Sequence, residues 1–270
     1  MTEIFHYTFM QNALLAGILV SLAAGIIGSL IVVNRLVFLT GGIAHSSYGG
    51  IGLAIYFSLP IFLGASLFTI ATALLLAWLT FRRRHLSDTY IGMIWAVGMA
   101  LGVIFVDLTP GYNVDLMSYL FGSILAVEHR DLWFMGLLLL GVLFFVHRWY
   151  RELLAISYDS EYAELRGIPS SRFYTLLLIL SALTVVAAIK VVGLILVIAL
   201  MTIPTHIAQH HSSTLYGMMI RSALLAALFT LAGLWLSYRY DLTSGACIIL
   251  VGATGLIADA LYRRFGPKAA

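Results

Sequence analysis

Long apolar segments alternate with short polar ones along almost the whole chain. Nine apolar runs stand out between charged residues or proline and glycine breaks, at residues 12–33, 43–59, 61–80, 90–107, 132–147, 173–189, 191–208, 215–237 and 244–262. A helix rises about 1.5 Å per residue, so about 20 residues cross the hydrocarbon core of a bilayer. The pattern predicts an all-α, polytopic bundle of about eight or nine transmembrane helices.

One further apolar stretch, residues 117–127, is too short to span a membrane and contains Gly122. Such a segment is tolerated at membrane depth where protein surrounds it. We therefore expect a re-entrant or interfacial helix here. The whole chain, residues 1–270, is expected to form a single transmembrane domain.

The composition supports lipid as the solvent. Hydrophobic residues make up 61% and charged residues 10% of the chain, against roughly 45–50% and about 25% in soluble domains. The spans leave no room for a sizeable aqueous domain, which argues against an enzyme with its own soluble domain. The net charge of +3 reports membrane topology rather than a nucleic-acid partner. Cys247 is the only cysteine, so no intrachain disulfide is possible.

Basic residues cluster in the short connecting segments, and these clusters predict the orientation. Cytoplasmic loops of membrane proteins carry an excess of Lys and Arg. Nine spans place all three clusters on the cytoplasmic side, with the N-terminus outside and the C-terminus inside. The clusters are Arg82 to Arg84, then Arg148, Arg151, Arg166 and Arg172, and finally Arg263, Arg264 and Lys268.

The longest strongly polar stretch, residues 150–172, contains the signals of one short helix of about two turns. Ser160 is the expected N-cap, Gly167 stands at the position after the helix, and Pro169 follows shortly. Such a helix is either a plain connector or an element that inserts into a groove on a cytoplasmic partner. The chain has no GxxxxGK phosphate loop followed by Ser or Thr, so ATP-driven transport would require a separate ATPase.

The block from Tyr158 to Pro169 reads acidic residues followed by A-x-x-x-G-I-P. Together with four other stretches, it resembles the metal-cation (zinc, manganese or iron) permeases of ABC importers, and the resemblance covers almost the full length. The other stretches are residues 9–17, 35–45, 91–125 and 192–204.

This resemblance implies a type II ABC importer-like permease that translocates divalent metal ions into the cytoplasm with ATP hydrolysed by a separate subunit. It implies a homodimer or pseudo-dimer in the prokaryotic cytoplasmic (inner) membrane, two ATPase subunits and an extracytoplasmic metal-binding protein. The permease itself would be no enzyme and would hold no permanent cofactor. The segment at about residues 157–170 would couple it to the ATPase, through Glu161, Ala163, Gly167 and Pro169.

His45 is the first candidate for the metal path, because ionisable groups at membrane depth are costly and often functional. Imidazole suits zinc, manganese and iron. The resembled family commonly carries Asp four residues earlier, on the same helix face, whereas this chain has Gly41 there. His45 is therefore either a ligand on the path or a hydrogen-bonded structural histidine.

His206 is the second candidate, two residues after Pro204, which is expected to bend its helix. His206, His210 and His211 form either an exit site or an ordinary polar boundary. In the last apolar run, Asp259 and Arg263 are spaced to form an ion pair at i,i+4.

Two other functions compete with an ATP-driven permease. A secondary transporter driven by protons or sodium needs an intramembrane carboxylate pair or a broken-helix ion site, and the middle of the spans holds almost no acid. An intramembrane enzyme needs a positioned nucleophile and base or a metal dyad, and neither HExxH nor GxSxG is present.

Overall fold

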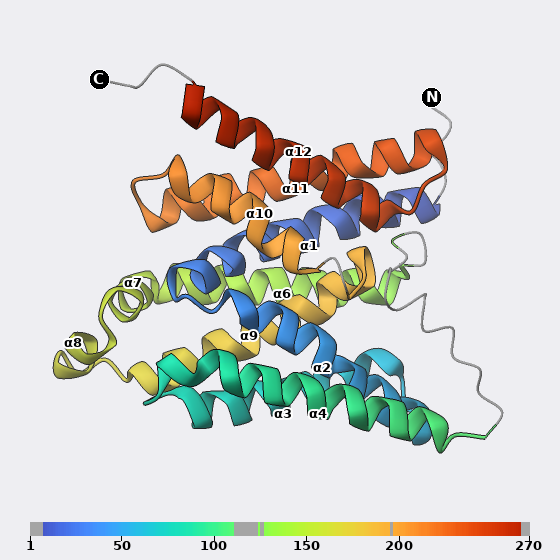
Figure 1. The fold of residues 1–270 in the computed structure, drawn as a ribbon, viewed down its shortest axis with the longest axis horizontal. Helices are drawn as coiled ribbons and strands as arrows, with labels where there is room; N and C mark the ends of the chain where they lie inside the picture. The colour runs from blue at the N-terminus through green and yellow to red at the C-terminus, as the bar shows by residue number, and fades with distance from the viewer. Residues whose placement is uncertain (1–7, 111–123, 125–126, 195–196, 266–270) are drawn as a thin grey trace.

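The computed structural model describes residues 8–110, 124, 127–194 and 197–265, and within these ranges every regular element is a helix. The long helices lie side by side and run in alternating directions (Figure 1). They are α1 (Thr8–Val33), α2 (Val37–Tyr56), α3 (Ile61–Thr80), α4 (Ser87–Asp107), α6 (His129–Arg148), α9 (Ser170–Val192), α10 (Val197–His210), α11 (Leu215–Tyr240) and α12 (Ser244–Phe265). Shorter elements are the 3-10 turn η2 (Arg84–Leu86), α7 (Tyr150–Tyr158) and α8 (Ser160–Leu165).

Seven of the described helices are long and apolar enough to cross a membrane, namely α1, α3, α4 with η2, α6, α9, α11 and α12. The other two long helices, α2 and α10, fall short by this measure. With 14 residues, α10 is about 21 Å long, less than the thickness of the hydrocarbon core. Most of α2 is buried by protein, so its small and polar residues need not face lipid.

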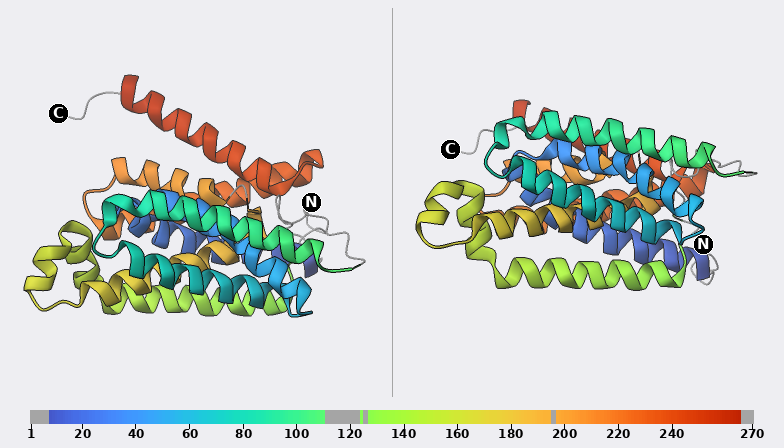
Figure 2. Two further views of the ribbon diagram at one scale, coloured as in Figure 1. Left: turned by 60° about the horizontal axis from the view of Figure 1, so that its bottom comes forward. Right: turned by 90° about the horizontal axis from the view of Figure 1, so that it is seen from below.

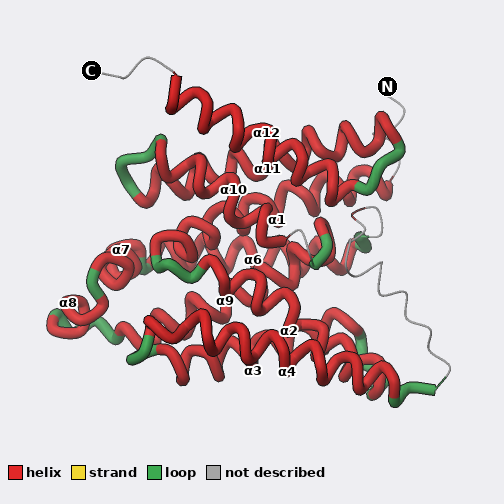
Figure 3. Tube along the Cα trace, in the orientation of Figure 1, coloured by secondary structure: helices red, strands yellow, loops and turns green. Residues whose placement is uncertain are grey.

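The connections fall at two opposite ends of the bundle (Figure 3). One end, which we call the basic end, carries residues 34–36, 81–86 and 211–214, together with α7, α8 and the last turn of α12 (Figure 1). The opposite end carries residues 57–60 and 241–243 and the first turn of α1. Since the three arginine clusters gather at the basic end, their predicted common side is consistent with the fold.

Glycines bring helix backbones into direct contact, as small residues do in membrane bundles. A Cβ atom on Gly52 would lie 2.5 Å from the carbonyl oxygen of Gly102, where α2 meets α4. Between α1 and α11, a Cβ on Gly25 would lie 2.4 Å from the Cα of Ala223. Glycines therefore set the closest helix–helix approaches of the bundle.

The last helix leaves the bundle along its length. All buried residues of α12 lie between Gly245 and Gly252, in its first half, and the second half points away from the other helices (Figures 1 and 2). A Cβ on Gly233 of α11 would lie 2.4 Å from the Cα of Ile248, so the anchored half is tightly packed.

α2 begins at Val37 rather than at residue 43, because Gly41 and Gly42 lie inside the helix instead of breaking it. Two further differences from the sequence prediction concern α9 and α7. The expected division at Lys190, between runs 173–189 and 191–208, is wrong: α9 continues to Val192 and the chain turns at Gly193, whose φ is 84°. A positive φ suits glycine, which has no Cβ to collide with the backbone. The second difference is α7, which the sequence analysis missed. The expected helix in residues 117–127 lies, except for Ile124 and Val127, outside the described residues.

Candidate coupling segment and translocation path

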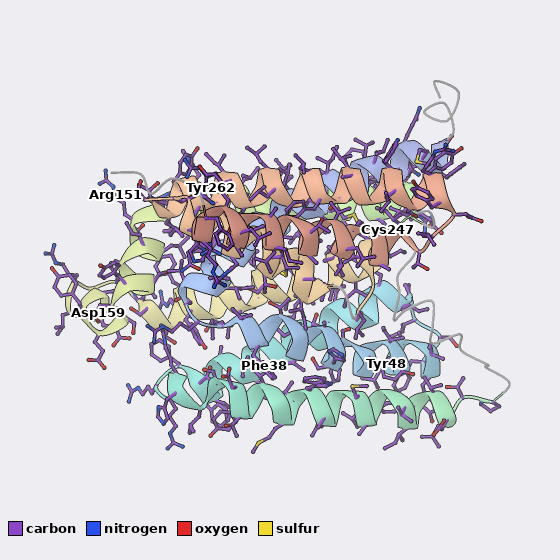
Figure 4. The ribbon with its side chains drawn as sticks, turned by 45° about the horizontal axis from the view of Figure 1, so that its top comes forward. Phe38, Tyr48, Arg151, Asp159, Cys247 and Tyr262 are labelled. Atoms are coloured by element: carbon purple, nitrogen blue, oxygen red, sulfur yellow. The ribbon has the colours of Figure 1, made fainter. Side chains whose placement is uncertain are left out.

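The coupling segment, residues 157–170, projects beyond the basic end of the bundle. In Figure 2 the pair α7 and α8 extends past the neighbouring helices, and Figure 4 shows Asp159 at this extremity. The buried side chains of Leu153 and Ile156 pack α7 against the rest of the protein. α7 therefore supports α8 at a distance from the membrane helices.

Asp159, rather than the expected Ser160, caps the N-terminus of α8. Its side-chain carboxylate accepts hydrogen bonds of 3.0 Å from the backbone N–H groups of Glu161 and Tyr162. Ser160 is instead the first helical residue, and its carbonyl oxygen accepts a 3.2 Å bond from the hydroxyl of Ser170. Asp and Ser are both good N-cap residues. The prediction of Ser160 as the cap therefore placed the start of α8 one residue too late.

Gly167 ends α8 as the sequence predicted. Its φ is 79°, and its N–H donates to the carbonyl of Glu164 at 2.9 Å while the N–H of Ile168 donates to that of Ala163 at 3.0 Å. These two bonds form a Schellman motif, which requires a left-handed residue at this position. Pro169 follows two residues after Gly167 and directly precedes α9. The turn therefore sets the direction in which α8 leaves the membrane bundle.

One side of the coupling segment is buried and the other is exposed to solvent. Ala163 is fully buried, where a larger side chain would push α8 off its support. Glu161 is exposed, and so are three large apolar or aromatic side chains, which together with it we call the coupling surface: Tyr158 (93% exposed), Tyr162 (51%) and Leu165 (86%). Large apolar side chains exposed together outside the bundle make this segment a candidate interaction site.

His45 lies at mid-helix on α2, between the labelled residues Phe38 and Tyr48 in the sequence (Figure 4). Its Nδ1 lies 2.8 Å from the carbonyl oxygen of Gly41, and its ring packs on that of Trp95 with centroids 4.3 Å apart. A carbonyl oxygen only accepts, so Nδ1 is the protonated nitrogen in the neutral ring. Its Nε2 therefore keeps a free lone pair for a ligand.

Gly41 sits where α2 meets α10. A Cβ there would lie 2.7 Å from the Cδ1 methyl of Ile198. The glycine that replaces the family's aspartate therefore allows α2 and α10 to approach closely. The backbone carbonyl of Gly41, rather than a side chain, orients His45. Metal-binding histidines are commonly oriented in this way, by a backbone carbonyl that accepts from the ring nitrogen not bound to the metal.

His206 and His210 lie on one exposed side of α10 near the basic end. Their ring centroids are 4.6 Å apart, and His210 Nδ1 lies 2.8 Å from the carbonyl oxygen of His206. The same tautomer argument leaves Nε2 of His210 free. Pro204, expected near the end of this helix, lies inside it and is buried.

His211 does not join these two histidines; it pairs with a carboxylate on α12. Its Nε2–H donates to the carboxylate of Asp259, and Arg263 Nε lies 2.9 Å from the other carboxylate oxygen. The predicted Asp259–Arg263 pair is thus confirmed, with His211 as an additional partner. This three-residue group, which we call the α12 latch, joins the outlying half of α12 to the end of α10.

Sequence reasoning missed two contacts of this region. Lys190 of α9 lies 2.9 Å from the nearly buried carboxylate of Asp131 on α6; the two are far apart in sequence, so no local pattern shows the pair. Trp95 stacks on His45 across helices and gives no sequence signal either. Within the described residues no three His, Cys, Asp or Glu side chains are grouped to hold a metal ion.

Comparison with known proteins places these features in context. Residues 6–263 match the ABC 3 transport family. The chain is 46% identical over 98% of its length to an uncharacterized membrane protein of Synechocystis, covering 94% of that protein. It is 34% identical to the manganese transport system membrane protein MntC of Halalkalibacterium halodurans, over 98% of this chain and 90% of the relative.

A solved structure shows the same arrangement of helices. A chain in the structure of PsaBC from Streptococcus pneumoniae in complex with Fab superimposes with a TM-score of 0.84 at 28% identity. The similarity covers 96% of this chain and 93% of that one. Fold and sequence therefore agree over nearly the whole length.

Proposed function

The chain belongs to the ABC 3 transport family, and we propose that it is the permease subunit of a binding-protein-dependent ABC importer that carries divalent metal ions into the cytoplasm. The relatives named for manganese transport make manganese the first candidate. Zinc and iron share its imidazole ligand chemistry and are the alternatives.

We place the basic end in the cytoplasm of a prokaryotic cell, following the distribution of arginine. The nine long helices then alternate in direction across the membrane layer, with α2 and α10 inside the bundle rather than against lipid; α10, with 14 residues, covers only part of the hydrocarbon thickness. The N-terminus lies outside and the C-terminus inside. An extracytoplasmic metal-binding protein would dock at the opposite end.

The coupling surface is the proposed binding site for a separate cytoplasmic ATPase. The observation that supports this is the exposure of Tyr158 at the end of α7 and of Tyr162 and Leu165 on the capped helix α8. Both helices are held out from the bundle at its basic end (Figure 2). Burial of these side chains in a groove would remove a large apolar area from water, at about 25 cal/mol per Å2. Glu161 adds a charge at the rim, and the Gly167 turn followed by Pro169 fixes the angle of approach.

His45 is the proposed ligand on the transport path. Its Nε2 is free, its ring is oriented by the Gly41 carbonyl, and the side chain is only partly buried. A second copy of the chain would bring a second His45 across a two-fold axis. Few ligands suit a conduit, because an ion held by a full cage of ligands leaves slowly.

His206 and His210 are the proposed exit ligands at the basic end. Histidines spaced i,i+4 share one helix face, and the two rings are already in contact. In this arrangement a metal that has passed His45 meets a second weak site before the cytoplasm.

Assembly tests the proposal. We expect the permease to copurify with a nucleotide-binding subunit when the two are expressed together, and Glu161→Arg to reduce that copurification while the permease remains in the membrane at normal abundance. An Asp107→Arg variant, with the same charge change at the exposed C-terminus of α4 and outside the coupling surface, is the matched control. Wild-type assembly in the Glu161 variant would count against the coupling surface, and uptake that persists without any ATPase would favour a secondary transporter.

A further inference from the structure

A large groove opens at the basic end between α3, the start of α4 and the start of α9. Its volume is about 890 Å3, and it runs from apolar side chains on α3, including Leu74 and Trp78, to Arg82 and Arg83 at the turn that follows. Tyr90 and Ser171 complete its polar end. The groove is therefore apolar along α3 and cationic where that helix reaches the basic end.

Its two guanidinium groups are free to bind a ligand. Arg82 and Arg83 are exposed, and neither takes part in the ion pairs formed within the described part of the chain. Glu164 is the only acid among the groove residues, so the lining carries a net charge of +1, from two arginines and one glutamate. An anionic group is attracted here and a cationic one is not.

The apolar wall decides the kind of anion. Trp78 is 79% exposed and Leu74 is 46% exposed, and both lie on α3, a candidate membrane span. Tryptophan is enriched at the level of lipid headgroups, where its ring is partly in hydrocarbon and its N–H is near water. A small soluble anion would leave this wall uncovered, whereas an amphiphile with a negative head and an acyl chain covers both parts.

We propose that this groove is a specific site for one anionic phospholipid of the cytoplasmic leaflet. Its phosphate lies between Arg82 and Arg83, and an acyl chain lies along Leu74 and Trp78. Basic pockets between membrane helices on the cytoplasmic side bind such headgroups.

The site adjoins the coupling segment. A second cavity of about 320 Å3 shares Phe81, Arg82 and Glu164 with the groove and extends to Glu161 on α8. Arg84, which also lines this second cavity, has its Nε and Nη2 buried without a hydrogen-bond partner. Because Arg82 shares this cavity with Glu161 and Glu164, a phosphate bound to Arg82 would change the electrostatic potential at both carboxylates.

Direct lipid binding to the full-length permease tests the proposal. Delipidated protein is titrated with phosphatidylglycerol or phosphatidylcholine and the bound lipid is counted by native mass spectrometry. A basic residue near an anionic lipid strengthens binding by about fivefold, so Arg82→Gln with Arg83→Gln should weaken phosphatidylglycerol binding by about thirtyfold. Arg148→Gln with Arg151→Gln, the same charge change at the same end, should leave it within about twofold.

A second measurement locates the acyl chain. Phosphatidylglycerol brominated on its chains should quench tryptophan fluorescence more than the brominated phosphatidylcholine does, and Trp78→Phe should remove that excess. Millimolar inorganic phosphate should not displace the lipid. The proposal is overturned if both lipids bind equally, if the two arginine pairs lose binding equally, or if phosphate alone competes. It also fails if Arg82→Gln with Arg83→Gln abolishes ATPase assembly and leaves phosphatidylglycerol binding intact, because the groove would then belong to the protein partner.

Discussion

The imidazole of His45 is hydrogen-bonded to the carbonyl oxygen of Gly41, one turn earlier on the same helix, at 2.8 Å. This contact makes Nδ1 the donor and leaves Nε2 available. It also explains how the histidine is held in place at a position without the carboxylate expected from the resembled family. The geometry is the same whether the free nitrogen binds a metal or remains unused, so substitution has to decide.

Replacing His45 by alanine should lower metal uptake by about tenfold or more, because loss of one ligand from a weak site removes much of its affinity. Uptake of radioactive manganese by cells carrying the transporter measures this, with membrane abundance determined in the same samples. Trp95→Phe keeps an aromatic ring beside the histidine and serves as the control. Equal uptake in the His45→Ala variant and the wild type would assign His45 to structure.

Gly41→Asp should restore a carboxylate on the face that His45 occupies and should shift metal preference toward the hard ion manganese over zinc. The new Cβ would lie 2.7 Å from the Cδ1 methyl of Ile198, so the substitution is made together with Ile198→Val, which shortens that side chain. Competition of the two metals in the uptake assay gives the ratio. No change in the ratio relative to Ile198→Val alone would argue that this part of α2 does not touch the ion.

Gly167→Leu should weaken coupling without disturbing the bundle. Nothing lies within 4 Å of a Cβ at this position, but its φ is 79°, and a left-handed conformation costs a residue with a side chain about 1–2 kcal/mol. ATP hydrolysis by the assembled complex and copurification of the ATPase report the effect. Gly167→Asn, which tolerates this conformation better, should retain most of both. Identical behaviour of the leucine variant and the wild type would contradict the role of the turn.

Asp259→Ala should release the second half of α12, because the α12 latch joins that half to the end of α10 while the buried residues lie in the first half. Lost hydrogen bonds to a charged group contribute about 1.5–3 kcal/mol. Hydrogen exchange of residues 253–265 should become faster. Thr254→Ala, whose hydroxyl bonds only to the carbonyl of Val251 within its own helix, is the matched control. Unchanged exchange in Asp259→Ala would show that other contacts hold the helix.

Gly25→Ala should destabilise the bundle strongly. The added Cβ would lie 2.4 Å from backbone atoms of Ala223, which cannot move aside as a side chain does, and overpacking of this kind costs about 1–3 kcal/mol. Gly141→Ala adds the same methyl on α6 with nothing within 4 Å and should raise stability slightly, by about 0.5–1 kcal/mol. Thermal unfolding in detergent compares them. Similar melting temperatures would contradict the close α1–α11 contact.

Most helices were predictable from the sequence because lipid selects long apolar runs, and a break in such a run is visible as a charge, proline or glycine. The prediction failed where that rule does not apply. At the α9–α10 boundary the charge of Lys190 is neutralised by Asp131 inside the fold, so the helix continues past it. α7 is short and amphipathic, and its few apolar residues carry no membrane signal.

The short helix within residues 157–170 was also predictable, since capping and glycine C-termini are local rules. Only its cap, predicted at Ser160 and found at Asp159, was wrong. The surroundings of His45 were not. Trp95 and Ile198 reach this part of α2 from other helices, and only tertiary packing brings them there.

Reconstitution in liposomes tests the central claim most directly. The permease is incorporated with or without its ATPase subunit, the extracytoplasmic binding protein loaded with manganese is added outside, and ATP is enclosed. We predict metal accumulation only when ATPase and ATP are both present. Accumulation by the permease alone, driven by a proton or sodium gradient, would contradict the account.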